Sequence, residues 1–279
     1  MNGFKSFTLI TGMTAVLVAF GFIWRGETGV VLALGVGLLM NAVGYFFSDS
    51  IVLAMYRARV VAQGEAPDLH AIIANLAQRA GLPMPRIALI PDETPNAFAT
   101  GRNPDHAVVA VTEGILRVLN RAELEGVIAH ELGHVKHRDI LLGSLAAVLA
   151  QAIIFISHMA LWITPRDEEG RSNPIAGILM YILGPIAAMM LQMALSRSRE
   201  YMADEYSAHL TGRPDMLASA LQRLAGYNAQ VPMRDAEPAT AHMMIVNPLS
   251  GEGIASLFST HPPMAKRIAR LNAMPIEAR

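Results

Sequence analysis

Residues 120–136 read NRAELEGVIAHELGHVK and carry the pattern H-E-x-x-H at His130, Glu131 and His134. Asn120 and Glu123 have the spacing of a capping box, which predicts a helix that begins after Asn120. On a helix, a spacing of four residues turns a side chain about 40° beyond one full turn and about 6 Å along the axis. Both imidazoles therefore share one face, and the sequence predicts that His130 and His134 bind one metal ion.

Glu131 is rotated about 100° from His130 and flanks the ion, where it can remove a proton from a bound water molecule. Taken alone, H-E-x-x-H occurs by chance often enough to be a weak signal. The predicted helix, the small Gly133 beside the ion and the strands that precede the helix strengthen the interpretation.

A catalytic zinc site needs a third protein ligand, and the sequence restricts its chemistry. The chain contains no cysteine, and no third histidine follows at the spacing H-E-x-x-H-x-x-G-x-x-H. Glu200 and Asp204 share one face of a predicted helix. Glu200 is thus a candidate ligand, with Asp204 as hydrogen-bond acceptor for an imidazole. The alternative is that both are solvated surface carboxylates.

The composition indicates contact with lipid. Hydrophobic residues make up 53% of the chain and charged residues 16%, which is below the level usual for soluble domains. The formal net charge of -1 argues against a broad nucleic-acid-binding surface, so no nucleic-acid partner is expected.

Four apolar runs have approximately the length of about 20 residues that a membrane-spanning helix needs. They are Phe7–Trp24, Gly29–Phe47, Ile140–Thr164 and Ile175–Leu195. Basic residues flank the soluble segments, which favours a cytoplasmic location for those segments. Two crossings between His134 and Glu200 return the chain to the side on which it started, so the three candidate ligands can meet.

The expected fold is an α+β integral membrane protein with four transmembrane helices and a mainly helical, zincin-type catalytic domain that carries a small β-meander. The meander comprises strands at Arg86–Ile90, Asn96–Thr100 and His106–Val111, after a helix at Asp68–Arg79. The expected division is a membrane hairpin at 1–50, a first catalytic part at 51–139, a second hairpin at 140–195 and a second catalytic part at 196–279.

Four stretches together resemble the HtpX family of membrane-bound zinc metalloproteases, the bacterial heat-shock proteases. These stretches are Asn96–Gly101, His130–His134, Ser198–Asp204 and Phe258–Pro263, and the resemblance covers nearly the whole chain. It implies one Zn²⁺ per chain with Glu200 as third ligand and Asp204 as its hydrogen-bonded support. It also implies a multi-pass protein of the cell inner membrane that cleaves misfolded or damaged membrane proteins.

Two further segments gain a candidate role. Asn96, Ala97, Phe98 and Ala99 are expected to form an exposed edge strand that binds substrate through main-chain hydrogen bonds. His261, beside two prolines, is a candidate donor to the oxyanion of the reaction intermediate. The alternatives are an ordinary hairpin strand and an incidental loop histidine.

The sequence therefore predicts a zinc-dependent endopeptidase that acts on polypeptides from the lipid bilayer. Two other functions stay open at this point. One is a prenyl-protein endopeptidase of the CAAX type, which the family resembles more distantly. The other is a non-enzymatic membrane scaffold with a structural metal site, for which Glu131 would have no purpose.

Overall fold

A computed structural model describes residues 2–146, 181, 198–228, 240, 243–246 and 262–275. The helices are α1 (Asn2–Met55), α2 (Pro67–Ala80), α3 (Glu113–Val118), α4 (Arg121–Lys136), α7 (Ser198–Thr211), α8 (Pro214–Asn228) and α9 (Met264–Asn272), with a 3-10 turn, η1 (Pro104–His106). The strands are β1 (Arg59–Val60), β2 (Arg86–Ile90), β3 (Ala97–Thr100) and β4 (Val108–Thr112). The predicted helix-rich α+β class is confirmed.

Local signals explain where the helices begin and end. The Asn120 side chain accepts from the Glu123 amide, and the Glu123 side chain accepts from the Asn120 amide, so the capping box at the start of α4 is complete. At the end of α2, Gly81 adopts a left-handed conformation with φ of 62° and donates its N–H back into the helix. Both boundaries follow the sequence prediction.

The sheet has the strand order β1-β2-β4-β3, so the predicted β-meander was wrong. β4 pairs parallel to β2, and β3 pairs antiparallel to the outer side of β4. The segment after β2 crosses the end of β4, where the Asp92 carbonyl accepts from Gly114 N–H and the Asn96 amide donates to Thr112 Oγ1. Gly114 is required there because a Cβ would lie 2.0 Å from the Glu93 carbonyl oxygen.

Both faces of the sheet are covered, and most residues of β2, β3 and β4 are apolar. Alternate residues face a core shared with the helices, and these are Ile87, Ala97, Ala99, Val109 and Val111. The residues between them face a second core with the end of α1, and these are Ala88, Ile90, Phe98, Val108 and Ala110. This period of two is the one expected of strands.

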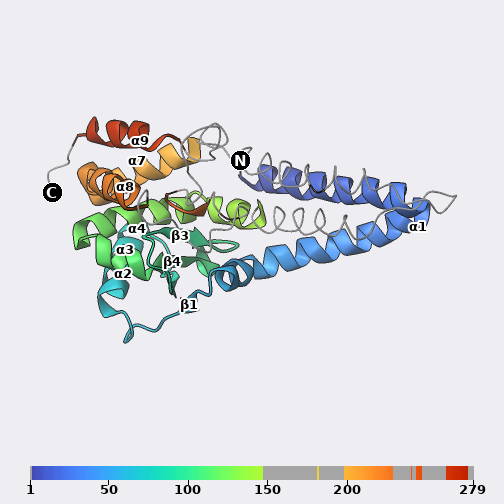
Figure 1. Cartoon of the computed structure of the whole chain (residues 1–279), viewed down its shortest axis with the longest axis horizontal. Coiled ribbons are helices and arrows are strands. Elements are labelled where there is room, and N and C mark those ends of the chain that lie inside the picture. The colour runs from blue at the N-terminus through green and yellow to red at the C-terminus, as the bar shows by residue number, and fades with distance from the viewer. Residues whose placement is uncertain are drawn as a thin grey trace.

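Helix α4 occupies the centre of the compact part of the molecule. It packs against β3 and α2 on one side and against α7 and α8 on the other, while α9 lies on α7 and α8 (Figure 1). The H-E-x-x-H residues are therefore placed between the edge of the sheet and a second layer of helices.

Helix α1 contains the first two predicted spans. Gly26 has φ of 58°, which interrupts a right-handed helix, and Figure 1 shows α1 as two arms that run in opposite directions. No single helix among the described residues has both the length and the apolar character needed to cross a bilayer. Gly26–Leu39 and Ala42–Met55, which meet at 47°, satisfy these criteria only as a pair. The predicted number of four spans is not confirmed.

The other two predicted spans fall mainly outside the described residues. The third, Ile140–Thr164, is described only as far as residue 146, where it is helical. The fourth, Ile175–Leu195, is described only at Tyr181.

Candidate metal centre

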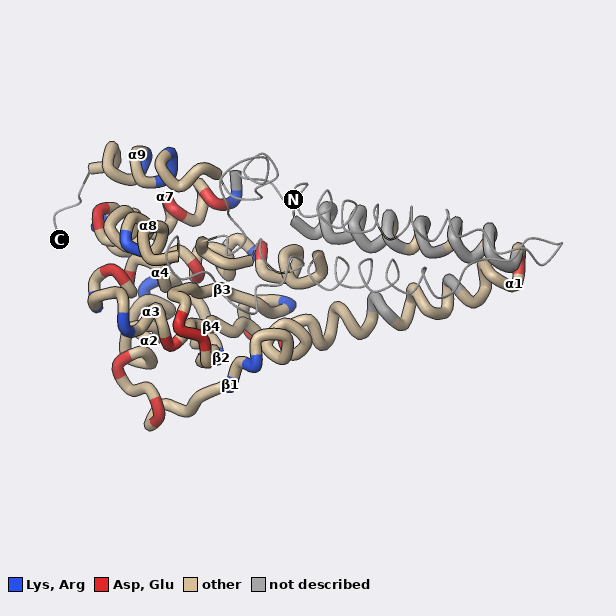
Figure 2. The backbone as a smooth tube through the Cα atoms, viewed as in Figure 1, with Lys and Arg blue, Asp and Glu red and all other residues tan. Residues whose placement is uncertain are grey.

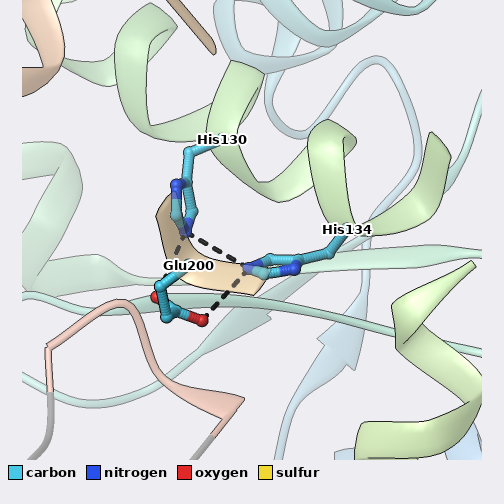
Figure 3. Close-up of side chains that lie close together, drawn as sticks. All are labelled: His130, His134 and Glu200. Carbon is cyan, nitrogen blue, oxygen red and sulfur yellow. Dashed lines mark hydrogen bonds and ion pairs between the residues drawn. The ribbon is translucent and has the colours of Figure 1, made fainter. Parts of the chain in front are cut away.

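The side chains of His130, His134 and Glu200 converge on one point (Figure 3). The Nε2 atoms of the two imidazoles are 3.3 Å apart. Glu200 Oε1 lies 3.5 Å from His134 Nε2, and Glu200 Oε2 lies 3.7 Å from His130 Nε2. A tetrahedral zinc ion with bonds of about 2.0–2.2 Å holds its ligand atoms roughly 3.3–3.6 Å apart, so the three residues fit this ion.

Each candidate histidine ligand has a carboxylate beside its other ring nitrogen. His130 Nδ1 lies 2.9 Å from Asp204 Oδ1, and His134 Nδ1 lies 3.5 Å from Asp139 Oδ2. Such carboxylates orient imidazoles so that Nε2 is free to bind a metal. The structure therefore places Asp204 where the sequence predicted it and adds Asp139 as the corresponding partner of His134.

Electrostatics distinguish the buried carboxylates. Burial would raise the pKa of Asp204, but the charge of Arg267 and the hydrogen bond to His130 outweigh burial and hold it below its ordinary value. Burial raises the pKa of Glu131 to about 7, and the nearby Glu200 acts in the same direction. Asp204 thus stays ionised, while Glu131 has the pKa expected of a general base or acid near neutral pH.

Glu131 points into a cavity of about 40 Å³, which is also lined by His134, Glu200, Arg199 and Met243. The backbone amide of Ala99, on β3, donates to the Glu131 carboxylate. Within the part of the chain that the structure describes, Glu131 Oε2 is buried and has no hydrogen-bond partner. One carboxylate oxygen is therefore available to a water molecule or to the substrate.

The predicted substrate strand is only partly placed as expected. β3 is the edge strand of the sheet, but all four of its residues are buried, so the expected exposure was wrong. Both faces of β3 are covered, and a segment at 243–246, here named the strap, lies along its outer edge. Ile245 N–H donates to the Ala97 carbonyl over 3.0 Å. Asn96 Nδ2 donates to the Val246 carbonyl over 2.9 Å.

The four residues predicted to bind substrate, Asn96 to Ala99, therefore differ in their access to the metal centre. Ala99 lines the cavity, whereas Phe98 points to the opposite face of the sheet and packs against Tyr56 at 5.6 Å between ring centroids. Asn96 and Ala97 are bonded to the strap. A role in substrate binding stays a prediction for all four.

Arg267 is the main residue of the centre that the sequence analysis missed. It lies on α9 and is fully buried, and its guanidinium contacts Asp204 and Glu200. No local pattern marks it, because it contacts residues far away along the chain. His261, the other predicted catalytic residue, lies outside the described residues.

Comparison with known proteins agrees with this geometry. The model of peptidase family M48 matches residues 63–275. A protease HtpX homolog of Desulfatibacillum aliphaticivorans is 52% identical over 276 residues, which is 97% of this chain and 89% of that protein. The homolog of Pyrococcus furiosus is 52% identical, with 96% and 94% covered, and that of Paraburkholderia phytofirmans is 51% identical, with 98% and 97% covered.

The fold also resembles that of a solved structure. The crystal structure of Ste24p from S. mikatae superposes with a TM-score of 0.55 at 21% identity. The match covers 97% of this chain and 65% of that chain, so this protein spans about two thirds of its length. The family match and the HtpX relatives lead to one conclusion: this chain belongs to peptidase family M48, among the HtpX proteases, and is a zinc-dependent endopeptidase.

Proposed function

We propose that the zinc ion of this peptidase is bound by His130, His134 and Glu200 and that Glu131 is the catalytic base. The observation that carries the proposal is the set of distances of 3.3–3.7 Å among the three ligand groups. Membership of a metallopeptidase family favours this enzyme over a non-enzymatic scaffold.

A bound zinc ion would polarise a peptide carbonyl and make a water molecule more acidic. Glu131 accepts the proton of the attacking water through its available oxygen, and it then delivers that proton to the leaving amine. The Ala99 amide fixes the direction of the Glu131 carboxylate. Asp204 and Asp139 orient the two imidazoles.

We further propose a location in the cell inner membrane, with the catalytic part facing the cytoplasm. Residues 28–48 carry no charged side chain, and Figure 2 shows charged residues concentrated on the compact part of the molecule. Large apolar side chains of α1 are strongly exposed, including Val31, Leu38 and Phe47 at 69%, 68% and 56%. Exposed apolar surface of this extent is typical of a contact with lipid or protein.

Misfolded or damaged membrane proteins are the proposed substrates. Val52 and Leu53 at the end of α1 share a core with Phe98 of β3, on which Tyr56, the residue after α1, also packs. The strand that bonds to Glu131 is thus joined directly to the apolar arm. An active centre held beside the bilayer is suited to polypeptides that emerge from it.

The test uses the full chain, purified in detergent without a chelator. We expect one zinc per chain and cleavage of a destabilised membrane protein in preference to its folded form. Removal of the metal should abolish cleavage, and zinc should restore it. Full cleavage by the metal-free protein would contradict the zinc mechanism, whereas equal cleavage of both substrate forms would contradict only the proposed substrate class.

A further inference from the structure

Arg267 contacts several residues of the metal centre, although the proposed catalytic mechanism gives it no role. Its Nε and Nη2 donate to the two carboxylate oxygens of Asp204 over 2.9 and 2.7 Å. Its Nη1 lies 3.3 Å from Glu200 Oε2 and donates to the Ile245 carbonyl over 3.2 Å. The side chain is completely buried, and a buried cation is tolerated only where it is paired and hydrogen-bonded.

The guanidinium shape matters for the first contact. Asp204 Oδ1 accepts from Arg267 Nη2 and also faces His130 Nδ1 at 2.9 Å. This bidentate hydrogen bond fixes the plane of the Asp204 carboxylate, and the carboxylate in turn fixes the orientation of the His130 imidazole. The ammonium group of lysine is a point charge without two parallel N–H donors, so lysine cannot form this bidentate bond.

The same side chain balances charge around the centre. Glu131, Glu200 and Asp204 are three buried acidic groups, and the charge of Arg267 interacts with all three. Arg267 is fully buried and makes ion pairs with two of them. Its positive charge reduces the electrostatic free energy needed to bury Glu200 together with Glu131 and Asp204 before a metal binds.

The contact with Ile245 connects the centre to the strap. Ile245 accepts from Arg267 through its carbonyl and donates to the Ala97 carbonyl of β3 through its amide. The chain Asp204–Arg267–Ile245–Ala97 therefore joins α7, α9, the strap and the edge strand through hydrogen bonds.

We propose that Arg267 is a positioning residue of the metal centre, which holds the Asp204 and Glu200 carboxylates in ligand geometry and fixes the strap along the outer edge of β3. Arg267 does not itself bind the metal. The inference rests on the proposed ligand set His130, His134 and Glu200.

The test compares zinc affinity in Arg267→Met, Arg267→Lys and a matched control, Arg270→Met. Arg270 lies on the same helix, but it is half exposed and lies over the Tyr201 ring. Loss of a residue that supports metal ligands typically weakens metal binding about 10–100-fold. We expect this loss in Arg267→Met, a smaller loss in Arg267→Lys and none in Arg270→Met.

Two readouts separate positioning from simple filling of the core. The visible spectrum of the cobalt-substituted protein should change in Arg267→Met and not in Arg270→Met. In a double-mutant cycle, Asp204→Asn and Arg267→Met should together weaken zinc binding by less than the product of their separate effects, because both act through one contact.

Wild-type zinc affinity and an unchanged cobalt spectrum in Arg267→Met would overturn the proposal, and so would fully additive effects in the cycle. If Arg267→Met does not fold, Arg267→Lys decides the matter. A folded Lys variant with wild-type affinity and spectrum would equally overturn it. Failure of the wild-type protein to bind zinc would instead refute the ligand assignment itself.

Discussion

The chemistry of the centre depends on two acidic residues, Glu131 and Asp204, whose environments shift their pKa values in opposite directions. Both are buried, which favours the neutral form of each. At Asp204, Arg267 and His130 reverse this tendency. At Glu131, burial prevails and raises the pKa to about 7. Asp204 is therefore held in its ionised form beside His130, while Glu131 can exchange a proton near neutral pH.

The pH dependence of activity should report Glu131. A base acts only when deprotonated, so kcat/KM should be high above its pKa and fall as pH drops through it. A bound cation favours the ionised form, which places this acid limb at or below about pH 7. The measurement is kcat/KM between about pH 5 and 9. An activity that rises as pH falls through this window would show that another group is the base.

Glu200→Ala should weaken zinc binding much more than Asp204→Ala. The first substitution removes a carboxylate that faces both imidazoles, at 3.5 and 3.7 Å. The second removes a partner of His130, for which a loss of about 10–100-fold is typical. Zinc content after mild chelation measures the difference. Wild-type zinc content in Glu200→Ala would identify another residue as the third ligand.

Sequence reasoning found the residues that a local pattern or the family resemblance marks, Glu200 among them, and it missed Arg267, which neither marks. His130 and His134 were placed together by helix geometry alone. Arg267 is 63 positions from Asp204, its bidentate partner. It is one of three basic residues on a short amphipathic helix, and nothing in that pattern signals the contact. Asp139 lies five positions after His134 and beyond the end of α4, so helix geometry did not pair the two residues.

At the scale of elements, helix boundaries were predictable and strand connections were not. The start of α4 after Asn120 was predicted at the residue that the structure shows, and α2 was predicted to within one residue at each end. The sheet order follows from the parallel pairing of β2 with β4, which are not consecutive strands in the chain. β1 was missed because it consists of two exposed residues.

The contact of α4 with α8 can be tested with one glycine pair. A Cβ on Gly126 of α4 would lie 2.8 Å from the Leu217 amide nitrogen of α8, so Gly126→Ala must force the two helices apart. Overpacking of this kind typically costs about 1–3 kcal/mol. A Cβ on Gly226 of α8 would meet no atom within 4 Å, and Gly226→Ala should stabilise its helix by about 0.5–1 kcal/mol.

Unfolding of both variants by denaturant, compared with the wild-type protein, measures these free energies. Equal stability of the Gly126 and Gly226 variants would mean that α4 and α8 are not packed as closely as the structure shows.

At the scale of the whole molecule, an apolar arm is joined to a compact catalytic part. The joint is the core around Val52, Leu53 and Tyr56, which packs on the sheet. The sequence predicted the two apolar runs of α1 from hydropathy. A hydropathy pattern does not determine where the helix bends, such as the angle of 47° between Gly26–Leu39 and Ala42–Met55. The second predicted pair of spans stays a prediction.

The proposed orientation in the membrane can be tested by cysteine labelling, because the chain has no cysteine of its own. Asp68→Cys and Gln222→Cys lie at exposed positions of the catalytic part, and Glu168→Cys lies in the predicted loop between the last two spans. With sealed cells and an impermeant thiol reagent, we expect labelling of Glu168→Cys only. All three should be labelled after lysis, which serves as the control.

Labelling at position 222 but not at 68 in sealed cells would place the two parts of the metal centre on opposite sides of the membrane. The ligand set could then not assemble. Labelling of both positions would instead reverse the proposed orientation and leave the metal centre intact.

The most direct test of the central claim is peptide cleavage by a zinc-loaded Glu131→Gln variant. Glutamine keeps the size of the side chain but cannot accept the proton of the attacking water, and loss of a general base typically costs about 10²–10⁴-fold in rate. Zinc content and cleavage are measured on the same preparation. The account predicts one zinc per chain, as in the wild-type protein, with cleavage reduced to this degree. Wild-type cleavage by the zinc-loaded variant would contradict it.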